Sequence, residues 1–196
     1  MIYQAEVSDD NPFYQIFLKN IASGDVKQVS PGTGKTTCAW IHPEQDKVLF
    51  SSTHEDSEAK NKMNAEIEQR KSGVQHSYAW DYDEYYDIYE TDFTGGGIKN
   101  LTQTLGYDAE ASWSPDGKKI AFASNRRAYA EKLSDEEAAL FKANPSALID
   151  IYIMDADGSN VKRLTQTKSY DGGPFFSPDG KRVVWRRFSD NGREAE

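Results

Sequence analysis

The chain repeats a block of its own sequence at a fixed spacing, and this repeat restricts the possible folds more than any other feature. The stretch 87–125 matches the stretch 150–188 with a constant offset of 63 residues. Ile-Tyr, Leu-Thr-Gln-Thr, Tyr-Asp and Ser-Pro-Asp-Gly-Lys motifs recur in the same order. A more divergent copy covers 15–53, where we expect Trp40 to take the place of Trp113. Tandem copies of this kind predict a repeat architecture.

Each copy predicts short β-strands joined by tight hairpins. The runs 118–124 and 150–155 are rich in β-forming residues with partial two-residue alternation. The SPDG and DADGSN segments supply the Pro, Asp and Gly that tight turns need. Four antiparallel strands per copy, arranged around an axis, predict the blades of a β-propeller. A solenoid of stacked coils is the alternative, and it fits less well because the turns suit hairpins.

The repeat also carries a family resemblance. The wording WSPDGKxIAF at 113–122, followed by IYxMDxDG at 151–158 and RLT at 163–165, resembles the TolB-like propeller repeat. Members of that family are typically six-bladed, bacterial, and periplasmic or secreted. Similar propellers accompany hydrolase domains, and the segments YDAEA and YDGG resemble the subgroup that precedes a zinc aminopeptidase domain.

The resemblance implies an all-β fold with about three four-stranded antiparallel blades, half of a six-bladed ring. We therefore expect residues 1–196 to form one partial TolB-like propeller, with repeats at about 15–53, 87–125 and 150–188. A closed ring needs more blades than three. This favours a fragment of a longer protein over a half-ring that pairs with a second copy.

Two insertions lengthen the repeats beyond the ~40–45 residues of an ordinary propeller blade. The excess lies in the connection between the second and third strands, at about 52–86 and 126–148. In the second insertion, Ser134 and Glu137 have the spacing of a helix capping box. In the first, apolar residues four apart predict a helix within 55–71 that has only a thin apolar stripe.

Blade topology places both insertions on one face. In an up-and-down blade, the connections between strands two and three emerge on the same side as the connections between blades, opposite the hairpin turns. Loops on a rigid scaffold are where binding usually resides, so we expect this face to bind a partner. The candidate binding residues are Lys35, Tyr78, Trp80, Asp81, Tyr82, Asp83, Tyr107, Asp108, Tyr170 and Asp171.

These candidates have two interpretations each. The acidic and aromatic stretch 78–86 suits a peptide amine or a cationic partner. The structural alternative is that the acidic residues continuing into 87–92 are the outward side chains of a strand, which simply alternate. The repeated Tyr-Asp pairs could form a ring of phenols and carboxylates near the central channel. Alternatively, each Asp bonds loop amides while each Tyr covers the end of a blade.

The segment GTGKT at 32–36 resembles a phosphate-binding loop, but two features exclude a nucleotide site. Such a loop needs a glycine five residues before its Gly-Lys pair, where this chain has Val29. A helix should also begin at the lysine, whereas the following TTCAWI is typical of a strand.

Other catalytic or metal-binding patterns are missing from the sequence. The turn 155–160 lacks the terminal Glu of a calcium loop. The three histidines are not spaced as a metal set, although His54 and His76 with Glu55 or Asp56 remain an alternative. The single Cys38 is expected to be a small core residue. Without a G-x-S-x-G or H-E-x-x-H motif, we expect no catalytic residue, no metal and no cofactor in this chain.

Composition narrows the choice of partner. A formal net charge of −9 argues against nucleic acid, and the short apolar runs exclude membrane insertion. We expect a non-catalytic segment that binds protein or peptide as the accessory domain of a periplasmic or secreted peptidase. The alternatives are a stand-alone scaffold in a cell-envelope complex, or a hydrolase or lyase with its site in the channel. Self-association through exposed blade edges stays open.

Overall fold

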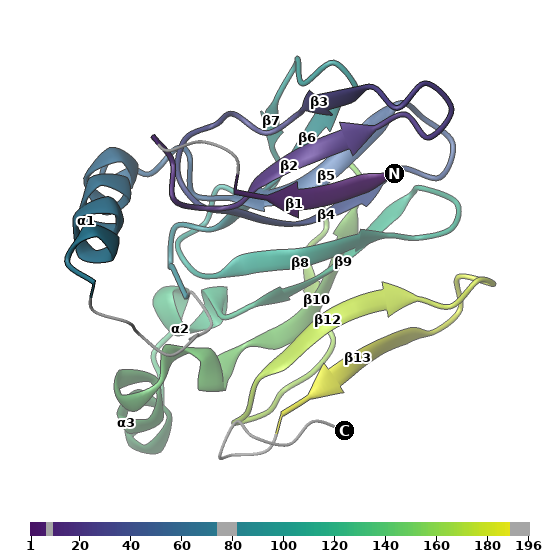
Figure 1. Cartoon of the computed structure of the whole chain (residues 1–196). Helices are drawn as coiled ribbons and strands as arrows, with labels where there is room; N and C mark the ends of the chain where they lie inside the picture. The colour runs from purple at the N-terminus through teal and green to yellow at the C-terminus, as the bar shows by residue number, and fades with distance from the viewer. Residues whose placement is uncertain (7–9, 74–81, 189–196) are drawn as a thin grey trace.

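A computed structural model describes residues 1–6, 10–73 and 82–188 of the chain. Its strands form four antiparallel sheets that follow one another along the chain (Figure 1). The first is β1 (Ile2–Ala5), β2 (Gln15–Lys19) and β3 (Val26–Gln28), and the second is β4 (Thr36–Ile41), β5 (Lys47–Ser52), β6 (Asp87–Asp92) and β7 (Lys99–Asn100). The third is β8 (Asp108–Trp113), β9 (Lys119–Ser124), β10 (Asp150–Asp155) and β11 (Lys162–Arg163), and the fourth is β12 (Asp171–Phe176) and β13 (Val183–Arg187).

The sheets pack face to face through their apolar side chains. One cluster between the second and third sheets contains Leu49, Ile88, Trp113 and Phe122, all buried. Comparable clusters join the first sheet to the second and the third to the fourth. Burial of this apolar surface, at roughly 25 cal/mol per Å², holds neighbouring blades together. The predicted architecture of four-stranded antiparallel blades is confirmed.

Both predicted insertions are helical. The connection between β5 and β6 carries α1 (Ala59–Lys71), and the connection between β9 and β10 carries α2 (Arg126–Ala130), α3 (Asp135–Ala143) and the 3-10 helix Pro145–Leu148. At the start of α3, the Ser134 hydroxyl accepts from the Glu137 amide at 3.3 Å while the Glu137 carboxylate accepts from the Ser134 amide at 3.0 Å. This is the predicted capping box, so the local sequence sets where α3 begins.

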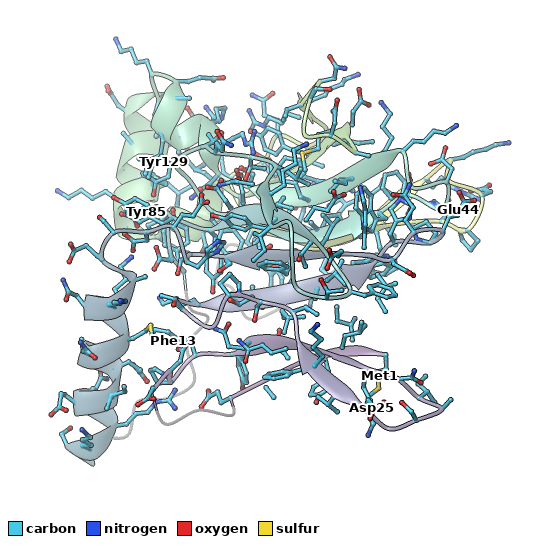
Figure 2. The ribbon with its side chains drawn as sticks, turned by 90° about the horizontal axis from the view of Figure 1, so that it is seen from above. Met1, Phe13, Asp25, Glu44, Tyr85 and Tyr129 are labelled. Atoms are coloured by element: carbon cyan, nitrogen blue, oxygen red, sulfur yellow. The ribbon has the colours of Figure 1, made fainter. Side chains whose placement is uncertain are left out.

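The helices gather on one face of the blades and the hairpin turns on the other. In Figure 1, all three α-helices lie on the left, whereas the β8–β9 and β12–β13 hairpins lie on the right. Figure 2, seen from above, places Phe13, Tyr85 and Tyr129 on the helix side and Asp25 and Glu44 on the turn side. We call the helix side the insertion face. Within the described part of the chain, no helix is long and apolar enough to cross a membrane.

The innermost strand of each of three sheets carries the same irregularity. In β4, β8 and β12 the pairing register shifts at the same place. There, Cys38, Glu110 and Gly173 have φ values of 52°, 58° and 62°. These left-handed residues mark a repeated β-bulge.

The bulges also correct one expectation from the sequence. Counting from them, Ile41 and not Trp40 takes the position of Trp113, because both pair with the first apolar residue of the next strand. Accordingly, Trp113 is only 3% exposed and Trp40 is 43% exposed. The expectation was wrong because it matched aromatic residues, whereas the pleat and the distance to the turn determine which residue is buried.

Candidate functional site

The insertion face brings together most of the residues predicted to bind a partner. Both insertions contribute to it, and so do the loops that connect successive blades. Tyr78, Trp80 and Asp81 fall within 74–81, outside the described residues. The others lie in the described part of the chain: Lys35, Tyr82, Asp83, Tyr107, Asp108, Tyr170 and Asp171.

An ion cluster lies where α1 meets the blades. The buried carboxylate of Asp83 accepts hydrogen bonds from Lys62 Nζ at 2.8 and 3.0 Å and lies 3.3 Å from Lys35 Nζ. A second buried carboxylate, that of Asp56, lies 2.8 Å from Lys62 Nζ. The cluster joins the loop between blades, α1 and the end of the first insertion. Sequence reasoning named Lys35 and Asp83 as binding residues and Asp56 only as an alternative metal ligand. It missed Lys62, because a contact across this many residues has no local sequence signature.

Aromatic rings flank both lysines of this cluster. Lys62 Nζ lies 5.0 Å from the centre of the Tyr85 ring, and Lys35 Nζ lies 5.4 Å from the centre of the Phe13 ring. Both distances are within the range of cation–π attraction. Tyr85 is 46% exposed, so one face of this aromatic group is available to a partner.

Tyrosine hydroxyls connect the first insertion to the second. Tyr82 and Tyr129 share a hydrogen bond of 2.7 Å between their hydroxyl oxygens, and Asn125 donates to Tyr82 Oη at 2.8 Å. The Tyr82 ring also stacks on Tyr107, with centroids 6.0 Å apart. The two insertions, which come from different blades, therefore form one continuous surface.

Asp108 and Asp171 are enclosed at the start of strands β8 and β12. Asp108 pairs with Arg126, which donates from Nη2 at 2.5 Å and from Nε at 3.2 Å. Asp171 pairs in the same way with Arg187, at 2.8 and 3.0 Å. Burial raises the pKa of Asp108 to about 6, against the opposing effect of Arg126. These pairs tie the start of β8 to the start of α2 and the start of β12 to the end of β13.

A third carboxylate, on the bulge of β8, bridges two blades. Glu110 accepts hydrogen bonds from Tyr170 Oη, from the Gly173 amide and, at 3.3 Å, from Tyr107 Oη. Burial first, and then the charge of Glu110, raises the pKa of both phenols. Sequence reasoning found the two tyrosines and missed Glu110. The glycine at the equivalent position 173 was the available signal, because a left-handed bulge favours Gly.

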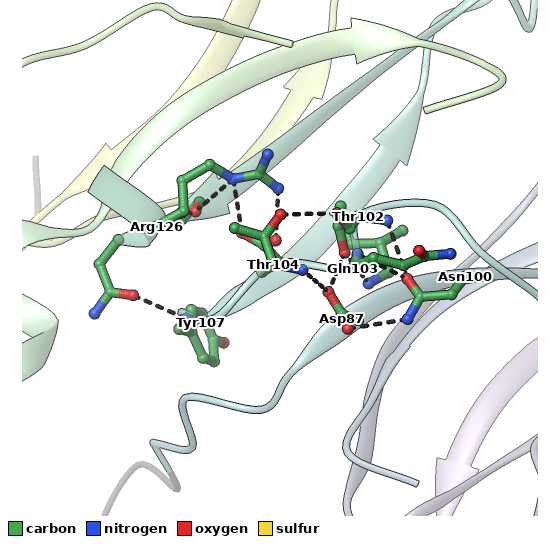
Figure 3. A network of polar contacts seen from close by, with 11 residues as sticks. Asp87, Asn100, Thr102, Gln103, Thr104, Tyr107 and Arg126 are labelled. Atoms are coloured by element: carbon green, nitrogen blue, oxygen red, sulfur yellow. Dashed lines mark hydrogen bonds and ion pairs between the residues drawn. The ribbon is translucent and has the colours of Figure 1, made fainter. Parts of the chain in front are cut away.

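The repeated Leu-Thr-Gln-Thr motif fastens the third strand of each blade to the fourth. Asp87 accepts from Thr102 Oγ1 at 2.5 Å and from the Thr104 amide at 3.2 Å (Figure 3). In the next blade, Asp150 accepts from the Thr167 amide at 2.9 Å in the same manner. These bonds hold the loops between blades in place below the insertion face. The recurrence of the Leu-Thr-Gln-Thr motif is thus explained by its structural role in each blade.

The loop that resembles a phosphate-binding loop has its amides occupied by the protein itself. Gly32 N donates to Gln15 Oε1 at 3.0 Å, Gly34 N to the Met63 sulfur at 3.3 Å, and Lys35 N to Thr53 Oγ1 at 3.1 Å. Strand β4 follows directly, where a nucleotide site would need a helix. This geometry agrees with the exclusion of a nucleotide made from the sequence.

The remaining candidates for chemistry have structural partners. His42 accepts from the Glu44 and Gln45 amides inside its turn. His54 lies against the Tyr89 ring, and burial lowers its pKa. His76 lies outside the described residues. Burial raises the pKa of the Cys38 thiol to about 11, which keeps it protonated. Among residues 1–6, 10–73 and 82–188, no three His, Cys, Asp or Glu side chains are arranged to hold a metal ion.

Two solved structures share this arrangement of blades. TolB from Acinetobacter baumannii matches with a TM-score of 0.59 at 23% identity, covering 99% of this chain and 39% of that chain. The putative TolB from Agrobacterium tumefaciens matches with a TM-score of 0.53 at 19% identity, covering 100% of this chain and 61% of that chain.

Two curated proteins show similarity in sequence. The Tol-Pal system protein TolB of Bordetella pertussis is 32% identical over 100 residues, which cover 38% of this chain and 23% of that protein. Dipeptidyl-peptidase 5 of Porphyromonas gingivalis is 33% identical over 87 residues, which cover 43% of this chain and 11% of that protein. The matches thus span less than a third of each relative. No protein-family model matches the sequence. In its arrangement of blades this chain has a TolB-like β-propeller fold, and its repeated motifs are similar to those of TolB.

Proposed function

We propose that this chain is a non-catalytic propeller segment that binds a protein or peptide through the insertion face. The main support is the continuity of that face. Two insertions from different blades meet at Tyr82 and Tyr129 and present exposed aromatic area beside an ion cluster. Aromatic side chains with one accessible face are common at the centres of protein interfaces.

We further propose that the full-length protein is a peptidase and that this segment orients its substrate. The similarity to dipeptidyl-peptidase 5 supports this role. The similarity to TolB supports the alternative of a stand-alone scaffold in a cell-envelope complex. Either role places the protein in the periplasm or outside the cell. A catalytic domain in the same polypeptide separates the two, because only the first role requires one.

Selection of displayed peptides against this chain tests the binding face. Tyr85 and Leu105 are each 46% exposed, Tyr85 on the first insertion and Leu105 on a loop between blades. Replacing either by alanine should lower the affinity of the selected peptides tenfold or more, since exposed anchor residues of this kind contribute upwards of ~1.4 kcal/mol to binding. Ile21 is the matched control, because it is 81% exposed and lies in the β2–β3 turn on the opposite side.

The outcomes separate the two faces. Peptides that lose affinity with Tyr85→Ala or Leu105→Ala and keep it with Ile21→Ser support the proposal. If the affinity of the peptides falls only with Ile21→Ser, they bind on the turn side, and the proposal is contradicted. In the full-length protein, Tyr85→Ala should raise KM for peptide hydrolysis with little change in kcat, because the segment binds substrate without touching the reacting atoms.

A further inference from the structure

The ion cluster on the insertion face has the composition of a receptor for an ammonium group. Two buried carboxylates, Asp56 and Asp83, converge on Lys62 Nζ. The Tyr85 ring covers the same nitrogen at 5.0 Å. Carboxylate oxygens combined with an aromatic face are the groups that recognise an organic cation. Here the cation is supplied by the protein itself, from helix α1.

One acceptor in this receptor is incompletely used. Asp56 Oδ1 accepts from the Glu58 amide at 2.9 Å. Asp56 Oδ2 is enclosed and, within the described part of the chain, accepts no hydrogen bond. It lies 2.8 Å from Lys62 Nζ, in an ion pair. An ammonium group that also donates a hydrogen bond to this oxygen would bind it more strongly than the ion pair alone.

The helix that carries Lys62 is weakly held. Ala59 is its only buried residue, and Met63 contacts the blades through the Gly34 amide. Near its end, Arg70 bonds Glu6 and the Pro12 carbonyl at the surface. Elements with few buried apolar contacts open at low free-energy cost. The packing of α1 therefore resists movement of Lys62 only weakly, and the ion pairs with the two carboxylates supply most of what holds it in place.

The charge balance favours replacement by another cation. Asp56 and Asp83 face the ammonium groups of Lys62 and Lys35. When Lys62 leaves, Asp83 keeps its contact with Lys35, whereas Asp56 loses its ion pair with Lys62. Breaking a buried ion pair in this way is strongly unfavourable, so the vacated position attracts a new ammonium group. Although burial lowers the pKa of Lys62, the two carboxylates outweigh this and raise it, so Lys62 itself is charged at neutral pH.

We propose that Asp56, Asp83 and Tyr85 form a receptor for a primary ammonium group of a partner peptide, and that Lys62 occupies it as an internal ligand. This inference rests on the proposed function, because it names the chemistry that the insertion face recognises. The ammonium group is either a peptide α-amine or a lysine side chain. Binding of the partner displaces Lys62 and with it the docked position of α1.

Chemical rescue tests the receptor directly. Lys62→Met removes the ammonium while keeping most of the side-chain volume. The thermal midpoint of this variant should fall by several degrees and then rise saturably with n-butylammonium chloride, beyond the effect of sodium chloride at equal ionic strength. The added change Asp83→Asn should abolish the rescue. If Lys62→Met does not fold, Lys62→Gln carries the same measurement.

The matched control is Lys71→Met on the same helix. Lys71 pairs only with Glu68 in the described structure, at the exposed surface, so its removal should produce no response specific to butylammonium. The proposal fails if Lys62→Met responds to butylammonium no more than to sodium chloride. It also fails if Lys71→Met responds equally.

Three small probes distinguish the source of the ammonium. Ala-Ala-Ala amide offers an α-amine, N-acetyl-lysine amide offers a side-chain amine, and N-acetyl-Ala-Ala-Ala amide offers neither. Calorimetric titration should show at least one amine probe binding Lys62→Met tenfold or more tightly than the unaltered chain, with the acetylated tripeptide binding neither. The stronger amine probe identifies the source.

Equal binding of the acetylated tripeptide contradicts the receptor. That failure is distinguishable from failure of the proposed function, because library peptides can still depend on Tyr85 and Leu105 without any free amine. Conversely, if butylammonium rescues Lys62→Met but the library yields no peptide that binds, the receptor is supported and the proposed function is not.

Discussion

The repeated bulge makes a prediction in which one substitution has different consequences at two equivalent positions. Cys38 and Glu110 both adopt left-handed φ values, which cost non-glycine residues of order 1 kcal/mol. Glycine would relieve that strain at either position. It would also add about 0.5–1 kcal/mol of chain entropy to the unfolded state. These two effects nearly cancel, so the side chain that is lost determines the outcome.

The two side chains differ in what they hold. Glu110 receives two close hydrogen bonds, from Tyr170 Oη and the Gly173 amide, and a longer one from Tyr107 Oη at 3.3 Å. Hydrogen bonds to a charged group contribute about 1.5–3 kcal/mol each. Counting the two close ones, and discounting for partial exposure, Glu110→Gly should destabilise the chain by about 2–5 kcal/mol. A thiol is a weak acceptor, so Cys38→Gly should change the stability by less than about 1 kcal/mol.

Urea unfolding of both variants measures this difference. The free energies of unfolding should differ between the two variants by more than about 1 kcal/mol, with unchanged m-values if the folded state is retained. Glu110→Gln is the control, because it keeps the side-chain volume and one accepting oxygen. Its free energy of unfolding should lie between those of the unaltered chain and Glu110→Gly. Losses that agree within 1 kcal/mol would refute the view that Glu110 joins two blades.

Three further predictions follow from the fold. Trp113→Ala should cost about 3–5 kcal/mol, as for large buried aromatic residues, whereas Trp40→Ala should cost less than about 1 kcal/mol; urea unfolding compares them. Ser134→Ala removes the capping box of α3 and should cost about 1 kcal/mol, measured by the same method. Hydrogen bonds from Ser134 and the Arg127 guanidinium lower the pKa of Glu137 to about 2. The contribution of that carboxylate is therefore present above its unfolded pKa near 4.5 and is lost as the pH falls towards 2, a dependence that Glu137→Gln should remove.

Much of the fold could be predicted because each copy of the repeat contains recognisable turn motifs between its strands. The SPDG and DADGSN turns determine where strands meet, since only a few residue types adopt these tight turns. The spacing of Ser134 and Glu137 fixed the start of α3 for the same local reason. Given four strands per blade, the side on which the insertions emerge follows from topology.

The parts that sequence reasoning missed depend on contacts between distant segments. Lys62 meets Asp83 across the first insertion, and Glu110 meets Tyr170 across two blades. Neither pair has a recurring spacing that could reveal it. The residue equivalent to Trp113 was misassigned in the first copy because aromatic residues were matched, whereas the distance to the turn gives that position to Ile41.

The central claim is that two insertions from different blades build one surface. Photo-crosslinking tests it most directly, with benzoylphenylalanine in place of Tyr129 and the crosslinked peptides identified by mass spectrometry. Because Tyr129 Oη lies 2.7 Å from Tyr82 Oη, we predict that the crosslinks map to the first insertion, at or next to Tyr82. Crosslinks confined to the hairpin turns at 20–25 or 43–46 would contradict the account.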